Sequence, residues 1–189
     1  MWNMKSEITL APGLLIAMPQ LADPNFHHGV VLMLEHGNGG SFGLVINRPA
    51  GNPVADLLDS ISVEWKGDSE SVAWLGGPVQ PETGWVLHEP VDGMPEEGTY
   101  EILPGLHLTS GTDSLKVLAK QPPRRVRFLL GYAGWGPNQL ESELTQGSWV
   151  NSDATADLIF DTPPEALWSA AVRRLGIEPD SLVPGAGVH

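Results

Sequence analysis

Glycine and proline together make up about a fifth of this chain, with 22 and 17 of its 189 residues. In an average globular protein the two add up to about 12%. They recur along the whole length with no fixed period, which argues against collagen-like and low-complexity structure. Because both residues interrupt helices and favour tight turns, we expect many short strands joined by turns.

The apolar runs between these turns predict strands. The clearest local prediction is a hairpin of residues 30–36 and 42–47 around the turn 37–40. Residues 126–132 are apolar at nearly every position and form the strongest candidate for a central strand. The other expected strands are residues 13–19, 72–75, 84–88, 106–110, 149–150 and 158–160, and residues 89–99 are expected to form an exposed loop.

Four helices are expected between the strands. The first opens at Asn52 and Pro53, the second at Thr112 or Asp113, and the third covers residues 138–146. The last carries a capping box of Thr162 and Glu165 and ends before Gly176. Because strands dominate and do not alternate regularly with helices, the pattern favours an α+β domain over a doubly wound sheet.

The length suits one domain over residues 1–189, of which residues 1–10 and 179–189 are expected to be tails. We also expect the side chains of Trp135 and Trp168 to be largely buried. The chain has no cysteine, which excludes disulfides, thiolate nucleophiles and iron–sulfur clusters. Its first 20 residues lack the pattern of a signal peptide and no apolar stretch could span a membrane, so a cytoplasmic location is expected.

The formal net charge is -13 and the pI is about 4.6. Such a surface repels nucleic acid unless its basic groups are gathered on one face. The one basic cluster is Arg124, Arg125 and Arg127, and its alternation with apolar residues indicates a half-buried strand before a DNA contact. Direct nucleic-acid binding is therefore disfavoured.

Residues 39–43 read Gly-Gly-Ser-Phe-Gly and match the G-x-S-x-G motif of serine hydrolases. In those enzymes the serine sits on a turn from strand to helix. Here the motif falls in a hairpin between two strands, so a turn is the preferred interpretation and a catalytic role for Ser41 is disfavoured.

Residues 131–137 read Gly-Tyr-Ala-Gly-Trp-Gly-Pro and lead from a strand into a helix near Asn138. A helix N-terminus at such a loop can hold an anion. Neither a phosphate-loop lysine nor the G-x-G-x-x-G order is present, so a tight turn anchored by Tyr132 and Trp135 is the preferred interpretation.

The remaining candidates are single polar residues. Arg48 follows the hairpin and could bind a carboxylate or a phosphate, while a structural salt bridge is the equal alternative. Residues 109–112 could hold a phosphate, although a helix cap is the simpler explanation. The histidines show no metal-binding spacing, and we expect neither a metal nor a cofactor.

Taken together, these segments resemble the AlgH/YqgE family of uncharacterised bacterial proteins. The resemblance is carried by residues 13–19, 23–26, 30–32, 43–49, 76–79, 86–88, 131–137 running into 139–141, Trp149 and 161–176, and it spans about residues 11–182. One position departs from it, because Asn138 stands where the family usually has a glycine. Asparagine tolerates left-handed torsions and can cap a helix, so the same backbone is expected there.

The resemblance implies an α+β fold with a mixed, mostly antiparallel, bifurcated sheet curled into a pseudo-barrel, with about four flanking helices. It also brings the label of transcriptional regulator, through a link to alginate control, but no catalytic residues that could be transferred to this chain. The catalytic residues of this chain, if it has any, stay unknown at this stage.

Three functions remain open. The first is a non-enzymatic regulatory or binding protein that acts through a small anionic ligand or a protein partner. The second is an enzyme on a phosphorylated or carboxylated metabolite, with Arg48 orienting the anion and His88 or Ser110 moving protons. The third is direct regulation at DNA. A shared pocket at the strand ends would draw on these candidate ligand-binding residues: Asn25, Phe26, Asn47, Arg48, Gly76, Gly77, Pro78, His88, Ser110, Tyr132, Trp135, Asn138 and Gln139.

Overall fold

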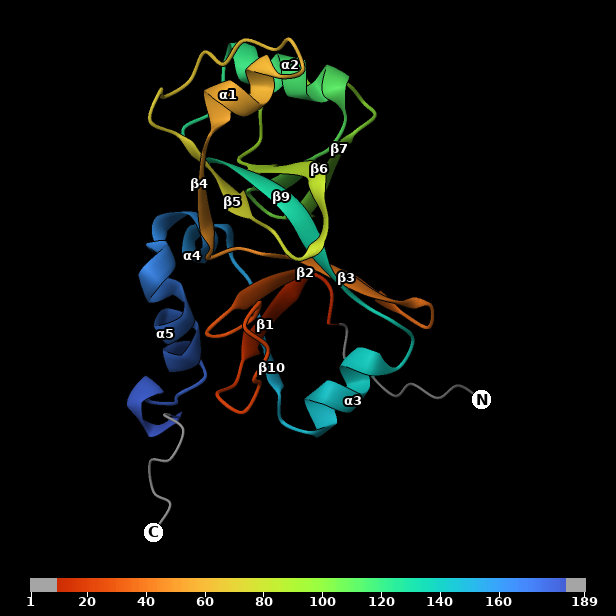
Figure 1. The fold of residues 1–189 in the computed structure, drawn as a ribbon, viewed down its shortest axis with the longest axis vertical. Helices are drawn as coiled ribbons and strands as arrows, with labels where there is room; N and C mark the ends of the chain where they lie inside the picture. Colours follow the sequence, from red (N-terminus) through yellow and green to blue (C-terminus); the bar gives the residue numbers. More distant parts are fainter. Residues whose placement is uncertain (1–9, 183–189) are drawn as a thin grey trace.

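The computed structural model describes residues 10–182 and shows an α+β fold, as expected (Figure 1). A mixed, mostly antiparallel sheet is curled into a half-barrel and flanked by five helices within this part of the chain. The strands are β1 (Gly13–Ala17), β2 (Val30–Gly37), β3 (Gly40–Val45), β4 (Pro49–Pro53), β5 (Val72–Leu75), β6 (Val79–His88), β7 (Thr99–Leu103), β8 (Leu106–Thr109), β9 (Val126–Trp135) and β10 (Trp149–Ser152). The helices are α1 (Val54–Asp59), α2 (Thr112–Lys120), α3 (Gln139–Thr145), α4 (Ala156–Asp161) and α5 (Pro164–Arg174), and a 3₁₀ turn, η1, covers Pro179–Leu182.

The sheet forks at β9. The order β10-β1-β2-β3-β9-β6-β8-β7 runs through this strand, and the β4–β5 pair branches from it. On one side β9 pairs with β6. On the other side β5 runs parallel to β9 at Leu129 and Leu130, and β3 then takes over at residues 133–135. The expected central strand is therefore confirmed, and it extends to Trp135.

Glycines allow the fork because the backbones approach closely there. A Cβ on Gly77 would lie 2.1 Å from the carbonyl carbon of Tyr132, and one on Gly76 would lie 2.5 Å from the Gly131 carbonyl oxygen. Gly131 itself has a φ of 76°, which favours glycine. The Gly76 carbonyl accepts a 2.7 Å hydrogen bond from the Val45 amide, and its amide donates to Leu130 at 2.7 Å. Gly76 thus joins β3 to β9.

Apolar side chains fill both faces of the sheet. Alternate residues of β1 point to opposite sides, so that Leu14 belongs to one core cluster and Leu15 to another. The first cluster lies under α4 and α5 and includes Trp168, while the second includes Trp135 and lies under α3. These two tryptophans are 7% and 6% exposed, which confirms their expected burial. A third cluster packs beneath α1 and α2.

The 30–36 and 42–47 hairpin is confirmed, but other local predictions were wrong. Residues 158–160 lie in α4, not in a strand, and the Thr155 hydroxyl caps this helix by accepting from the Leu158 amide at 3.2 Å. Thr162 ends α4 in an extended conformation, so it forms no capping box with Glu165, and α5 begins after Pro163.

Two further helix starts differ from the predictions. Asn52 lies in strand β4, and α1 begins after Pro53. Gly111, and neither Thr112 nor Asp113, occupies the N-cap of α2. Strands β4 and β7 were not predicted.

Most of the two expected tails falls on residues 1–9 and 183–189, which lie outside the described part of the chain. The first residues of the expected C-terminal tail, 179–182, instead form η1, which packs against α5 and buries Pro179. Within residues 10–182 no helix combines the length and apolarity needed to cross a membrane.

The fork predicts that Gly77→Ala destabilises the protein strongly. The new Cβ would overlap the β9 backbone, and the φ of 153° at this position disfavours a side chain, so we expect the free energy of unfolding to fall by about 3 kcal/mol or more. Gly84→Ala on β6 is the matched control, since its Cβ would meet no atom within 4 Å. Urea unfolding checks both variants, and equal midpoints would contradict this account of the fork.

Candidate functional site

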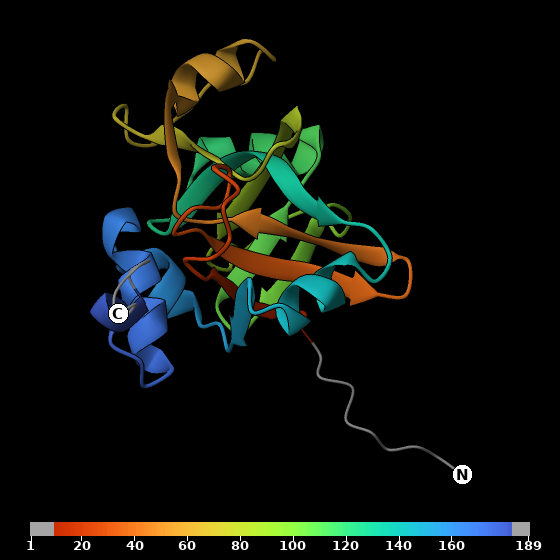
Figure 2. The same ribbon diagram turned by 60° about the horizontal axis from the view of Figure 1, so that its bottom comes forward.

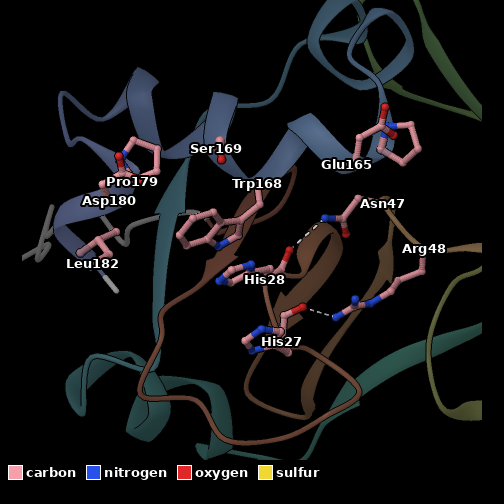
Figure 3. Close-up of a pocket in the computed structure, with 11 residues that line it drawn as sticks. His27, His28, Asn47, Arg48, Glu165, Trp168, Ser169, Pro179, Asp180 and Leu182 are labelled. Carbon is pink, nitrogen blue, oxygen red and sulfur yellow. Dashed lines mark hydrogen bonds between the residues drawn. The ribbon is translucent and has the colours of Figure 1, made fainter. Parts of the chain in front are cut away.

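A pocket of about 430 Å³ lies where the loop before β2 meets α5 and η1 (Figure 3). We name it the Arg48 pocket. It is lined by His27, His28, Asn47, Arg48, Pro164, Glu165, Trp168, Ser169, Pro179, Asp180 and Leu182. It therefore joins the N-terminal half of the sheet to the last helix of the described chain.

The side chains of Asn47 and Arg48 hold in place the loop that carries His27 and His28. Asn47 donates from Nδ2 to the His28 carbonyl at 2.9 Å, and its Oδ1 accepts from the Val30 amide at 3.1 Å. Arg48 donates from Nη2 to the His27 carbonyl. Figure 3 shows the bonds to both carbonyls as dashed lines. The end of the hairpin thus fixes a loop about twenty residues earlier in the chain, in which His28 adopts a φ of 54°.

Three aromatic rings stack across the pocket. The His27 and His28 rings lie 4.2 Å apart at 15°, and His28 lies 4.2 Å from Trp168 at 17°. Trp168 is fixed in turn, because its Nε1 donates to the Ala17 carbonyl at 2.8 Å. Burial lowers the pKa of His28, and the charges of His27 and Arg48 lower it further. The middle ring of the stack is therefore held neutral at pH 7.

Charged groups of both signs line the pocket. Arg48 forms no ion pair within residues 10–182, so this part of the chain supplies no structural salt bridge to it. Its guanidinium instead uses one of its five N–H groups on the His27 carbonyl. Glu165 and Asp180 are exposed carboxylates on α5 and η1. The site can bind an anion at Arg48 beside a flat aromatic surface.

The other sequence candidates lie elsewhere. Asn25 is exposed in the same loop but does not line the pocket, and its amide donates to Asp23 Oδ1 at 2.9 Å. The ring of Phe26 turns the opposite way and packs 6.2 Å from Trp135 and 5.4 Å from Trp149. Phe26 and Trp135 therefore belong to the core below α3.

Gly76 and Gly77 form the fork, with Pro78 exposed beside them. The Tyr132 ring packs edge-on against Phe42 at 5.9 Å. These residues shape the sheet and do not line the Arg48 pocket.

The start of α3, where anion binding was the less favoured interpretation, has one of its amides paired within the chain. Gln139 Oε1 accepts from the Gly136 amide at 2.9 Å. Asn138 has the left-handed φ of 63° expected of it, although its side chain makes no cap hydrogen bond. Glycine-like backbone geometry is thus preserved at the position where this sequence departs from the family pattern.

His88 and Ser110 lie away from the Arg48 pocket. Ser110 lines a separate cavity of about 340 Å³ with Trp85 and Leu115. His88 is fully buried, and its Nδ1 must donate to the Glu89 carbonyl at 2.7 Å. Burial lowers the pKa of His88 and so favours the neutral imidazole, in which Nε2 accepts from the Thr109 hydroxyl at 2.6 Å.

This neutral histidine predicts a loss of stability in mild acid. Burial is the main cause that lowers the pKa of His88 from its usual 6.5. The unfolded chain therefore takes up a proton first as the pH falls below 6.5, so the free energy of unfolding falls there and is fully retained above it. His88→Gln removes this contribution and should flatten the slope by up to about 1.4 kcal/mol per pH unit.

The measurement is urea unfolding of both proteins between about pH 5 and 7.5. The slope of the free energy of unfolding against pH is compared, because the variant also loses buried hydrogen bonds, which lowers its stability at every pH. His28 remains in the variant and contributes a slope of the same sign to both proteins. Identical slopes for the two proteins would contradict the buried, neutral state of His88.

Sequence reasoning found Asn47 and Arg48 but missed the residues that they hold and face. His27 and His28 follow the Asp-Pro-Asn-Phe turn, and a pair of adjacent histidines after a turn was the signal available in the sequence. Trp168 was assigned to the core, where most of its surface lies. Within the described residues no three histidine or carboxylate groups converge as a metal site.

The curled, forked sheet and the sequence define the same class of protein. The AlgH-like family model matches residues 14–180, and the chain belongs to that family. A UPF0301 protein of Myxococcus xanthus (strain DK1622) is 48% identical over 181 residues, covering 95% of this chain and 98% of that protein. A UPF0301 protein of Anaeromyxobacter sp. (strain K) is 43% identical over 185 residues, with 94% of both covered.

Solved structures agree with the fold. The solution structure of the AlgH protein from Pseudomonas aeruginosa superposes with a TM-score of 0.76 at 37% identity over the full length of both chains. A crystal structure from Corynebacterium diphtheriae gives a TM-score of 0.70 at 21% identity, covering 87% of this chain and 86% of that one. The second similarity shows the fold alone.

Proposed function

We propose that this chain is a cytoplasmic regulatory or binding protein, and that its Arg48 pocket takes a small anionic ligand without reacting with it. One observation supports this most strongly. Arg48 has no carboxylate partner within residues 10–182 and sits at the rim of a pocket beside three stacked rings. A guanidinium in this position binds carboxylates and phosphates well.

The walls of the pocket favour a particular kind of anion. The His27, His28 and Trp168 stack offers a flat surface for a planar or apolar body. Glu165 and Asp180 also line the pocket and repel further negative charge. The preferred ligand therefore has one anionic group, a planar body and hydroxyl or amino groups that can meet these carboxylates.

The placement of the other candidates supports binding over catalysis at this pocket. An enzyme working through Arg48 would need His88 or Ser110 within hydrogen-bond reach of the bound anion. Neither residue lines the pocket. His27 is exposed in it, but no hydroxyl or carboxylate orients its ring through a hydrogen bond within the described residues.

Direct action at DNA has little support in the charges. Within the basic cluster, Arg125 pairs with Asp157 at 3.0 Å and also with Asp161. Arg127 is buried with its guanidinium 4.3 Å from the Trp74 ring. Two of the three arginines are thus engaged within the fold, in a chain of net charge -13.

A thermal-shift screen against nucleotides, phosphorylated metabolites and small carboxylates tests the proposal. A ligand at about 100 times its Kd adds about 2.7 kcal/mol, which raises the Tm of a protein of this size by about 5–10 °C. Arg48→Ala should abolish this rise. Arg173→Ala is the matched control, because it removes an equal charge from an exposed position on α5 and should leave the rise unchanged.

The unliganded variants must be compared first. Arg48→Ala also loses its bond to the His27 carbonyl, so its own Tm will be lower, and the ligand-induced rise is therefore measured from each variant's own baseline. A ligand that stabilises Arg48→Ala as much as the wild type would contradict this site. Lack of a rise with every compound in the screen would contradict small-anion binding and favour a protein partner.

A further inference from the structure

The turn end of the β2–β3 hairpin faces the loop that leads from β9 into α3. In both views this hairpin end projects beside that loop (Figures 1 and 2). A hollow of about 650 Å³ lies here, which we name the hairpin hollow. Its lining includes Glu35, His36, Gly39, Ser41, Phe42 and Trp135. It shares no residue with the Arg48 pocket.

Three side chains in and beside the hollow form a continuous chain of polar contacts. Ser41 Oγ lies 2.6 Å from His36 Nδ1. The other ring nitrogen, His36 Nε2, lies 3.5 Å from Glu141 Oε1. This is the order of groups in a serine nucleophile, its base and the carboxylate that orients the base.

The nearby carboxylate favours the productive tautomer of the imidazole. Glu141 Oε1 lies 3.5 Å from Nε2 and can only accept, which favours a proton on Nε2. Nδ1 is then free to accept the Ser41 O–H proton. In the serine-protease template the two nitrogens have the opposite assignment, with Nε2 toward the serine. The proton relay is the same either way, because both ring nitrogens are equally able to exchange a proton.

The fold holds this arrangement firmly. His36 and Ser41 are directly opposed residues of β2 and β3, so their side chains share one face of the hairpin. Ser41 is also paired with Trp135 of β9, and the chain then turns into α3, which carries Glu141. Ser41 is only 8% exposed and lines the hollow, so its hydroxyl is shielded from bulk water on most sides.

Glycines precede the serine in the hairpin turn. A Cβ on Gly37 or Gly39 would meet no atom within 4 Å, so there is open space beside the turn. A Cβ on Gly40 would lie 2.5 Å from the Trp135 carbonyl oxygen, which excludes a side chain immediately before the serine.

We propose that Ser41, His36 and Glu141 form an ester-hydrolysing site in the hairpin hollow. Ser41 Oγ attacks the acyl carbonyl carbon while its proton passes to His36 Nδ1. The bond to the leaving alcohol breaks, and that alkoxide takes the proton from His36. Water then attacks the acyl-serine with His36 as base, Ser41 regains its proton, and a carboxylic acid leaves. Ester and water thus give alcohol and acid.

The lining restricts the substrate class. Leu34 and Phe42 offer apolar surface to an acyl chain, while Glu35 and the chain's negative charge disfavour anionic substrates. Neutral esters or thioesters with a short apolar acyl group fit best. The sequence alone disfavoured this serine because its motif falls in a hairpin. The partners that complete the site, His36 across the hairpin and Glu141 a hundred residues later, become visible only in the fold.

A purely structural role for Ser41 is the competing explanation, since a buried hydroxyl needs a hydrogen-bond partner. The two explanations differ in reactivity. The test exposes the protein to an alkyl fluorophosphonate, which phosphonylates activated serines, and follows intact mass and tryptic peptides. Hydrolysis of p-nitrophenyl acetate is measured in parallel. Ser41→Ala, His36→Gln and Glu141→Gln are compared with Ser142→Ala, an exposed serine on α3 beside the site.

The proposal expects one phosphonyl group per chain on Ser41 and ester hydrolysis above the buffer rate. Ser41→Ala should lose both, and His36→Gln should slow both by about a hundredfold or more. Glu141→Gln should show an intermediate loss, and Ser142→Ala should match the wild type.

Thermal melting confirms that each variant is folded. If His36→Gln is not folded, alkylation of His36 in the wild-type protein by an active-site-directed chloroketone replaces that substitution. Wild-type protein that is labelled no more than Ser41→Ala overturns the proposal, as does labelling of Ser41 that does not depend on His36.

Discussion

Strand β9 can pair with three other strands because glycine occupies the point at which their backbones meet. Gly76, Gly77 and Gly131 lie so close to neighbouring carbonyl groups that a Cβ on any of them would come within 2.5 Å of the backbone. This contact lets β5 leave the sheet and β3 enter it on the same side of β9. The curl of the sheet, and with it the separation of the three core clusters, follows from that fork.

The fork also sets where the two candidate sites lie. Strand β3 enters the sheet there with Ser41 near its start, and Asn47 and Arg48 follow its end. Ser41 lies near the start of β3, whereas Arg48 lies three residues beyond its last residue, Val45. The hairpin hollow and the Arg48 pocket therefore occupy opposite ends of one strand. Ligand binding at one end and ester hydrolysis at the other are separate proposals that can fail independently.

Local patterns were informative where burial is strong. The apolar run of β9 and the glycine turn of the β2–β3 hairpin predicted both elements correctly. Strand β4 escaped notice because all five of its residues are exposed and two are proline, so it has no hydrophobic alternation. Arg48 was found as a rare cation, but its setting depends on Trp168, which lies 120 residues away. Such pairing arises from tertiary packing, and no local spacing encodes it.

The central claim is that Arg48 and the ring stack bind a single small anion. A ¹H–¹⁵N NMR titration of the labelled protein with benzoate, a planar carboxylate, tests it most directly. The account predicts chemical-shift changes for the Trp168 indole N–H and for the backbone amides of His27, His28 and Arg48. The signal of the Trp149 indole N–H, which is hydrogen-bonded to Glu143 and lies in the other core cluster, should not shift. Shifts that miss these groups, or a spectrum unchanged at saturating benzoate, would contradict the claim.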